Sequence, residues 1–354
     1  MTGPRSASGA VYGEFSGAPS REELERFFFL DDADKARVAT RRSASSRLGF
    51  ALQLGTVRFL GVFLNDPTRV PGEVVDYVAE QVGAPSSALE GYLERRPTRF
   101  RHAAEITEVY GYREFAAVEK ELVRWLADRA WTTDEGSAVL FDGAVTWLRS
   151  RLILLPGLTT LARLVGRERD AASARGWSEL VAPLSAMQER ALRRLLVVPG
   201  DARLSELERL RQAESQVSGA GMARALQRVS EISALGVGEL DLSGVPRRRT
   251  VALARYGMAA KAPLLRRHPE PRRLATLVAT VHSLGARAVD DALELFDVLM
   301  TNDLMARAAR ASREEKLQRY PKLSKDAGKL AQAVGVLLEA LDGDQAVPVE
   351  RVWR

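Results

Sequence analysis

Apolar residues recur at steps of three and four along almost the whole chain, and this spacing limits the possible fold more than any other feature. It runs, for example, through Phe115, Val118, Leu122 and Trp125. Such steps place side chains on one face of an α-helix, whereas a half-buried strand needs strict alternation of apolar and polar residues. Alternation is brief and occurs at 236–244, which we interpret as a loop between two helices. The sequence therefore predicts an all-α fold.

Turn-forming residues divide the chain into helical parts. The chain has 354 residues, of which 46% are hydrophobic, and this is enough for more than one core. Ser20, followed by two glutamates, is typical of a helix start, and Gly83–Ser87 is rich in residues that end helices. We therefore expect a flexible tail over 1–20, a first small helical module over 21–84, a second over 85–176, and a larger helical domain over 177–354.

Two helices have distinctive apolar patterns. The helix that begins after Ser43 carries one stripe on each of two sides, formed by Leu48, Leu52 and Phe59 and by Phe50, Leu54 and Val57. Stripes on two sides predict a core helix, buried all round. Another apolar face continues without proline from Leu274 to Leu299. It predicts a long helix that forms a spine or an oligomer interface.

The composition excludes several classes of site and of location. The chain has no cysteine, which excludes disulfides, thiolate zinc sites and cysteine nucleophiles. The first twenty residues lack the apolar core of a secretory signal, and no charge-free apolar run is long enough to span a membrane. We therefore expect a cytoplasmic protein without a membrane partner.

No arrangement of residues is typical of a catalytic centre. The three histidines are far apart in the sequence, and no Gly-Lys-Ser or Gly-Lys-Thr occurs for a phosphate-binding loop. Four carboxylates that could bind magnesium crowd one segment, at Asp290, Asp291, Glu294 and Asp297. Without a phosphate-binding loop, we interpret them as a solvated or salt-bridged helix face. We expect no catalytic residue, no metal ion and no cofactor.

An excess of basic residues indicates a polyanionic partner. Lysine and arginine outnumber aspartate and glutamate by 52 to 46, which gives a formal net charge of +6 and a pI of about 9.7. A first basic cluster, with no acid after Asp34, consists of Lys35, Arg37, Arg41, Arg42, Arg47 and Arg58. Cations spaced along one surface bind DNA phosphates and release condensed counterions. The alternative is a solvated loop.

A second basic cluster leads directly into a predicted helix, in the run Arg95-Arg96-Pro97-Thr98-Arg99-Phe100-Arg101-His102. It is similar to the entry of a helix-turn-helix module, where arginines hold the DNA backbone and the following helix presents side chains to base edges. The alternative is a basic turn between domains. We interpret later arginines, among them Arg249 and Arg272, as structural, because arginine stems cover apolar helix surface and pair with acids elsewhere in a fold.

Several short runs occur in an order and at separations that indicate one family. The first are Ser20-Arg-Glu-Glu-Leu-Glu-Arg-Phe-Phe-Phe-Leu30 and Arg47-Leu-Gly-Phe-Ala-Leu-Gln-Leu54, with Arg58-Phe-Leu-Gly61. They are followed by His102-Ala-Ala-Glu-Ile106, Tyr110-Gly-Tyr-Arg-Glu-Phe115 and Ala288-Val-Asp-Asp-Ala-Leu-Glu-Leu-Phe-Asp-Val-Leu-Met300. These runs resemble the amino-terminal region of the large cointegrate-forming transposases of the Tn-three family. The resemblance covers roughly residues 20–300.

The resemblance implies a DNA-binding function for both small modules. In such transposases, two helix-turn-helix-like modules recognise the terminal inverted repeats of the transposon, and a helical part supports dimerisation. The implied partners are double-stranded DNA at transposon ends and a second copy or a full-length transposase, with the chain associated with the nucleoid when bound. The expected DNA-binding residues are Lys35, Arg37, Arg41, Arg42, Arg47 and Arg58 in the first module, and Arg95, Arg96, Arg99, Arg101, His102 and Arg113 in the second.

The resemblance also implies that a part of the family's machinery lies outside this sequence. Family members are much longer, and their phosphoryl-transfer centre is a set of three carboxylates on a downstream ribonuclease-H-like fold that holds metal ions. We therefore expect a DNA-binding fragment without that catalytic domain, either a truncated transposase or a competitive repressor of transposition. The alternative is a helical scaffold that binds other proteins and has no specific DNA target.

Overall fold

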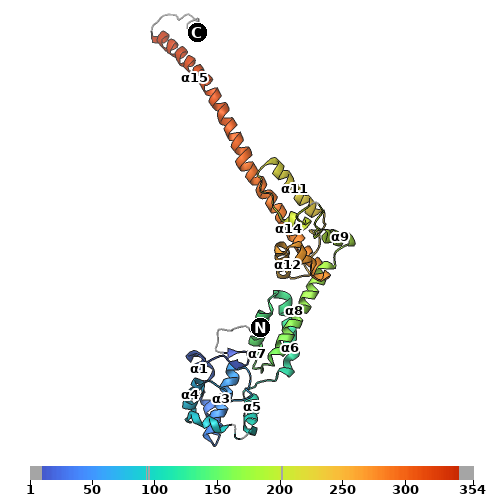
Figure 1. The fold of residues 1–354 in the computed structure, drawn as a ribbon. Coiled ribbons are helices and arrows are strands. Elements are labelled where there is room, and N and C mark those ends of the chain that lie inside the picture. Colours follow the sequence, from blue (N-terminus) through green and yellow to red (C-terminus); the bar gives the residue numbers. More distant parts are fainter. Residues whose placement is uncertain (1–9, 93, 95, 201, 343–354) are drawn as a thin grey trace. The chain divides into compact units, whose positions relative to one another are not determined.

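The fold is described by a computed structural model that covers residues 10–92, 94, 96–200 and 202–342 (Figure 1). Apart from one short hairpin, every regular element in this part of the chain is helical, so the all-α prediction is confirmed. The chain forms two compact units. Unit 1 contains the described residues up to 183, with 241–257 and 268–279; unit 2 contains 184–240, 258–267 and the described residues from 280 onward.

A short hairpin lies within the segment expected to be a flexible tail. Strands β1 (Ala10–Val11) and β2 (Glu14–Phe15) pair antiparallel. The Phe15 ring stacks on Phe59, with centroids 5.5 Å apart, and the Tyr12 hydroxyl donates a hydrogen bond of 2.6 Å to the carbonyl of Pro156. Aromatic packing therefore attaches residues 10–15 to unit 1, while residues 1–9 lie outside the described part.

The first core of unit 1 surrounds one central helix, α3 (Ala44–Leu60), which is buried along most of its length as the two apolar stripes predicted. All the neighbouring elements contact it: α1 (Arg21–Phe27), α2 (Asp32–Ala39), α4 (Gly72–Val82), the 3-10 helix η1 (Ser86–Tyr92) and α5 (Arg96–Val109). Gly49 and Gly55 of α3 lie directly under the rings of Tyr92 and Phe28. The absence of side chains at these two positions lets η1 and α1 pack closely.

Local sequence signals set the ends of these helices. The Ser20 hydroxyl accepts a hydrogen bond from the backbone N–H of Glu23 in a capping box, and the Ser43 hydroxyl accepts one from the backbone N–H of Ser46 at the start of α3. Helices α3 and α4 end at Gly61 and Gly83, whose φ angles of 77° and 62° favour glycine. The positions of these caps follow directly from residue type.

The second core of unit 1 is a group of three mutually packed helices, α6 (Phe115–Thr133), α7 (Ser137–Arg149) and α8 (Leu158–Val181). α5 belongs to the first core through Ile106, and the second core begins with α6. The expected boundary at 176 and 177 falls inside α8. Two later segments complete unit 1 against the end of α8, namely α12 (Arg247–Ala259) and the start of α14 (Glu270–Val298).

Unit 2 contains short helices and the rest of the long helical segment. Its elements are α9 (Ala186–Arg194), α10 (Glu206–Arg211), α11 (Gly219–Ser233), α13 (Ala262–Arg266), the end of α14, the π-helix η2 (Leu299–Met305) and α15 (Ala306–Asp342). The predicted long helix is confirmed by the 29 residues of α14. Asp291 forms an ion pair of 2.6 Å with Arg228, and this contact agrees with the interpretation of the acidic segment as a salt-bridged face.

The described residues lack a metal-binding cluster and a helix able to span a membrane. No group of three or more histidine, cysteine, aspartate or glutamate side chains there is arranged to hold a metal ion. None of the helices in the described residues combines the length and the apolar character that a membrane span requires.

Candidate nucleic-acid interface

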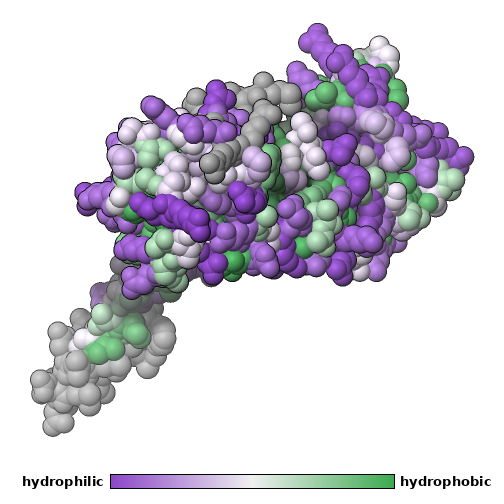
Figure 2. All heavy atoms as spheres, turned by 90° about the horizontal axis from the view of Figure 1, so that it is seen from below, coloured by the Kyte–Doolittle hydropathy of each residue, from purple (hydrophilic) through white to green (hydrophobic). Residues whose placement is uncertain are grey.

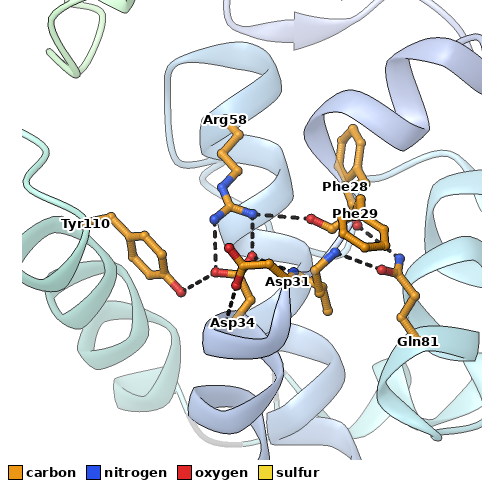
Figure 3. A network of polar contacts seen from close by, with 8 residues as sticks. Phe28, Phe29, Asp31, Asp34, Arg58, Gln81 and Tyr110 are labelled. Carbon is orange, nitrogen blue, oxygen red and sulfur yellow. Dashed lines mark hydrogen bonds and ion pairs between the residues drawn. The ribbon is translucent and has the colours of Figure 1, made fainter.

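Arg58, from the first basic cluster, is engaged inside unit 1. Its guanidinium donates two hydrogen bonds, of 2.8 and 2.9 Å, to the carboxylate of Asp34, which also accepts one of 2.7 Å from Tyr110 (Figure 3). Burial favours a raised pKa for Asp34, but the bonds from Arg58 and Tyr110 and the charge of Arg58 outweigh it, so the pKa lies below its ordinary value. These bonds join α2, α3 and Tyr110, the residue after α5. They leave little of the Arg58 guanidinium exposed for contact with DNA.

Arg37 and Arg41 share one acid on α5. Arg41 lies 2.8 Å and Arg37 3.4 Å from the carboxylate of Glu105. The Arg41 side chain is 9% exposed and covers the Phe50 ring at 3.5 Å, whereas that of Arg37 is 41% exposed. Arg41 therefore serves packing, and Arg37 keeps part of its guanidinium on the surface.

The structure places His102 in the first core. Its side chain is 7% exposed, and Nδ1 lies 2.8 Å from the hydroxyl of Tyr92, which accepts a hydrogen bond from Gln53. Burial lowers the pKa of His102 to about 4, and the nearby charge of Arg41 acts in the same direction. A neutral ring in the core offers no charge to a phosphate.

The other expected residues of the second cluster differ in their surroundings. Arg99 donates a hydrogen bond of 2.6 Å to the carbonyl of Asn65 and is half-buried, whereas Arg101 is exposed. Arg113 is also exposed, and its backbone N–H and C=O bond to the segment that connects α7 and α8. Arg95 lies outside the described residues, as does the side chain of Arg96.

The cations that remain at the surface of the first core lie near two helix starts. Lys35 and Arg42 are exposed, and Arg47 is half-buried in the first turn of α3. Arg101 borders a hollow of about 560 Å³ that the hydroxyl groups of the first turn of α3 also line, among them Ser45. On the face seen from below, hydrophilic residues cover most of the surface and hydrophobic ones lie in small groups between them (Figure 2).

Helix α5 presents a mixed outer face near its start. Phe100 is 63% exposed, and Arg101 and Ala104 lie beside it on the same exposed side. His102 and Ile106 hold the opposite side in the core. An exposed arginine next to apolar groups can contact both a guanine edge and a thymine methyl in a major groove.

Helix α8 carries a second exposed basic face, which the sequence interpretation missed. Thr159, Arg163 and Arg167 point away from the second core, and Gly166 lies between the two arginines with open space where a side chain would be. Arg163 makes no side-chain hydrogen bond or ion pair within the described residues, and Arg167 pairs with Glu168 at 2.8 Å. The spacing of four residues between Arg163 and Arg167 could have indicated this face, but the nearby Glu168 and Asp170 make the segment mixed in charge.

The connection into α8 is held in place by backbone hydrogen bonds. Helices α7 and α8 pack on each other and on α6, and the residues between them are fixed to Arg113, which accepts from the backbone N–H of Leu154 at 3.0 Å and donates to the C=O of Leu152 at 2.8 Å. α8 thus follows a connection held by backbone hydrogen bonds and carries exposed basic side chains in its first turns.

Comparison with known proteins identifies relatives of this chain. Residues 6–167 match the family model described as "Domain of unknown function (DUF4158)". The chain is 38% identical over 331 residues to the transposase for transposon gamma-delta from Escherichia coli (strain K12), a match that covers 93% of this chain and 33% of that protein.

Two other relatives agree with this match. The transposase for transposon Tn4556 from Streptomyces fradiae is 51% identical over 142 residues, which is 40% of this chain and 16% of that protein. The transposase for transposon Tn501 from Pseudomonas aeruginosa is 28% identical over 323 residues, which is 91% of this chain and 32% of that protein. The chain thus spans at most about a third of the length of these curated relatives. It is related to the transposases of the Tn-three family, as the resemblance predicted, and carries the domain of unknown function DUF4158 over residues 6–167.

Proposed function

We propose that this chain binds double-stranded DNA at the terminal inverted repeats of a transposon. The observation that carries the proposal is the exposed face of α8, where Thr159, Arg163 and Arg167 follow a connection bonded to the backbone of Arg113. Relatives that match nearly the whole chain are transposases by name. A transposase must find the ends of its element, and a basic helix face on a rigid core is suited to that task.

Helix α5 supplies a second contact in this proposal. Phe100, Arg101 and Ala104 form its exposed face, and Lys35 and Arg42 provide nearby charge for phosphates. Arg58 and His102, which were expected to bind DNA, have no part in it, because one is paired with Asp34 and the other is in the core. In this proposal, α5 and α8 contact the bases, and the exposed cations around them contact the phosphates of the DNA backbone.

The proposed specificity is tested by titrating a labelled inverted-repeat end and a scrambled duplex with the chain at about 0.15 M salt. Specific recognition typically favours the right sequence by about 10³-fold or more. Arg163→Ala with Arg167→Ala should remove most of that preference, because base contacts carry the sequence information. The control is Arg319→Ala, which changes an exposed arginine of α15 that pairs with Glu315. This variant should keep the preference for the inverted repeat. Equal affinity of the unmodified chain for both duplexes would contradict the proposal.

Two further roles are proposed for the chain, one in self-association and one at transposon ends. A second copy is proposed to bind through α15, whose exposed apolar residues follow heptad spacing. In addition, a chain that covers the ends without cutting them competes with a complete transposase and represses transposition. The proposed site of action is the cytoplasm, on the nucleoid.

A further inference from the structure

A cleft within unit 1 gathers three guanidinium groups that the face of α8 does not use. It has a volume of about 330 Å³ and lies between α8, α12 and the first turn of α14, in the range of small-molecule sites. The three cations that line it are Arg169, Arg249 and Arg272. The sequence interpretation treated the last two as structural.

Arg249 is the fixed cation of the cleft. It is 6% exposed, and its guanidinium donates hydrogen bonds of 2.6 Å to the carbonyl of Ala130 and 3.1 Å to the hydroxyl of Ser173. Asp134 lies 3.3 Å away. Burial lowers the pKa of Arg249, and the charge of Arg169 also lowers it, against the effect of Asp134. Arg249 and Arg169 both line the cleft, so it holds two like charges.

Arg272 is held by aromatic rings rather than by an acid. Its guanidinium carbon lies 5.8 Å from the centroid of Trp177 and 5.6 Å from that of Tyr256. Within the described part of the chain, that guanidinium makes no ion pair or hydrogen bond. Contact with these two rings restricts the direction of the guanidinium but leaves its N–H groups free to donate.

The charges in the cleft favour a singly charged anion. Its lining includes three guanidinium groups and two carboxylates, Asp134 and Asp170, so one positive charge is left over. Asp170 lies 3.8 Å from Arg169, which is too long for a strong hydrogen bond. A phosphodiester group carries one negative charge, and planar guanidinium groups match its oxygens well. Because Arg272 covers the Trp177 and Tyr256 rings, the cleft offers charge rather than a stacking surface for a base.

We propose that this cleft binds a backbone phosphate of the same DNA duplex that α8 contacts, with Arg169 and Arg272 as its ligands. The inference rests on the proposed function. Arg163 and Arg169 are six residues apart on one helix, so they are separated by about 9 Å along its axis and about 120° around it. The sugar-phosphate backbones form the walls of the major groove on either side of an inserted helix. A duplex whose groove receives the first turns of α8 therefore has a backbone on the flank of the helix where Arg169 lies.

The salt dependence of DNA binding tests this cleft. Loss of one phosphate contact lowers the slope of log affinity against log salt concentration by about 0.9. We expect this decrease for Arg272→Gln and for Arg169→Gln with Arg272→Gln, whereas Arg272→Lys keeps the charge and should keep the slope. The preference for the inverted repeat over a scrambled duplex should not change, because phosphate contacts carry no sequence information.

Arg175→Gln is the matched control, because it removes one positive charge outside the cleft, from α8, the helix that carries Arg169. Arg175 stacks on Trp131 at 3.9 Å and pairs with Glu179 at 2.7 Å. Equal slopes for Arg272→Gln and Arg175→Gln would overturn the proposal, since only a general charge effect would remain. If Arg272→Gln unfolds the chain, the exposed Arg169→Gln gives the same comparison.

This outcome can be separated from that of the proposed function. If the unmodified chain does not prefer an inverted repeat, the proposed function fails, but the slopes of the variants can still be compared on any duplex. If the preference is present and the slopes do not differ, only the cleft is wrong.

Discussion

His102 is a titratable side chain that folding removes from water, and this links stability to pH. Its pKa is lowered from 6.5 to about 4, first by burial and then by the charge of Arg41, while Glu105 opposes the shift. Between these two pH values the unfolded chain binds a proton that the folded chain does not. The free energy of unfolding should therefore fall by up to about 3 kcal/mol as the pH decreases from 6.5 to 4, and be unaffected by this group above 6.5.

His102→Gln separates this effect from other titrations. Glutamine can still bond to the Tyr92 hydroxyl but does not titrate, so the variant should lose most of the decrease in stability over that range. Denaturant unfolding at a series of pH values measures it. A smaller decrease should remain, because burial also lowers the pKa of His268. An equal pH dependence in the variant and the parent would show that His102 is not the cause.

At the scale of elements, glycine has opposite roles in α3 and α8. A Cβ at Gly49 would lie 2.3 Å from the Tyr92 ring, whereas one at Gly166 would meet nothing within 4 Å. Gly49→Ala should therefore destabilise the chain by about 1–3 kcal/mol through overpacking. Gly166→Ala should stabilise it by about 0.5–1 kcal/mol, because alanine favours a helix. Denaturant midpoints compare the two, and a stabilising Gly49→Ala would contradict the close packing of α3 and η1.

At the scale of the whole molecule, the exposed apolar residues of α15 predict self-association. Tyr320, Leu323, Leu330 and Val334 are 45–71% exposed, and with Ala327 they follow the alternating steps of three and four of a coiled-coil seam. Leu323→Asp with Leu330→Asp should convert a dimer into a monomer in sedimentation equilibrium, without loss of helical content. Gln318→Asp with Lys325→Asp, off the seam, should leave the dimer intact. An unmodified chain that is monomeric at high micromolar concentration would rule out this seam.

Local chemistry determined the elements of this protein. Steps of three and four gave the all-α class, the buried α3 and the long α14, and Ser20, Ser43, Gly61 and Gly83 marked helix ends, because periodicity and capping depend on residues a few positions apart. Residue runs in order also indicated the family. These features need no knowledge of distant contacts.

Only the tertiary structure decided which cations are available. Arg58 binds Asp34, 24 residues away, and His102 is enclosed by Tyr92 and Phe50, whereas Arg163 and Arg167 remain at the surface beside acids that are close in sequence. The cleft with Arg249 and Arg272 likewise forms between segments far apart along the chain. Charge is a property of each residue, but its availability depends on partners and burial, and long-range packing sets both.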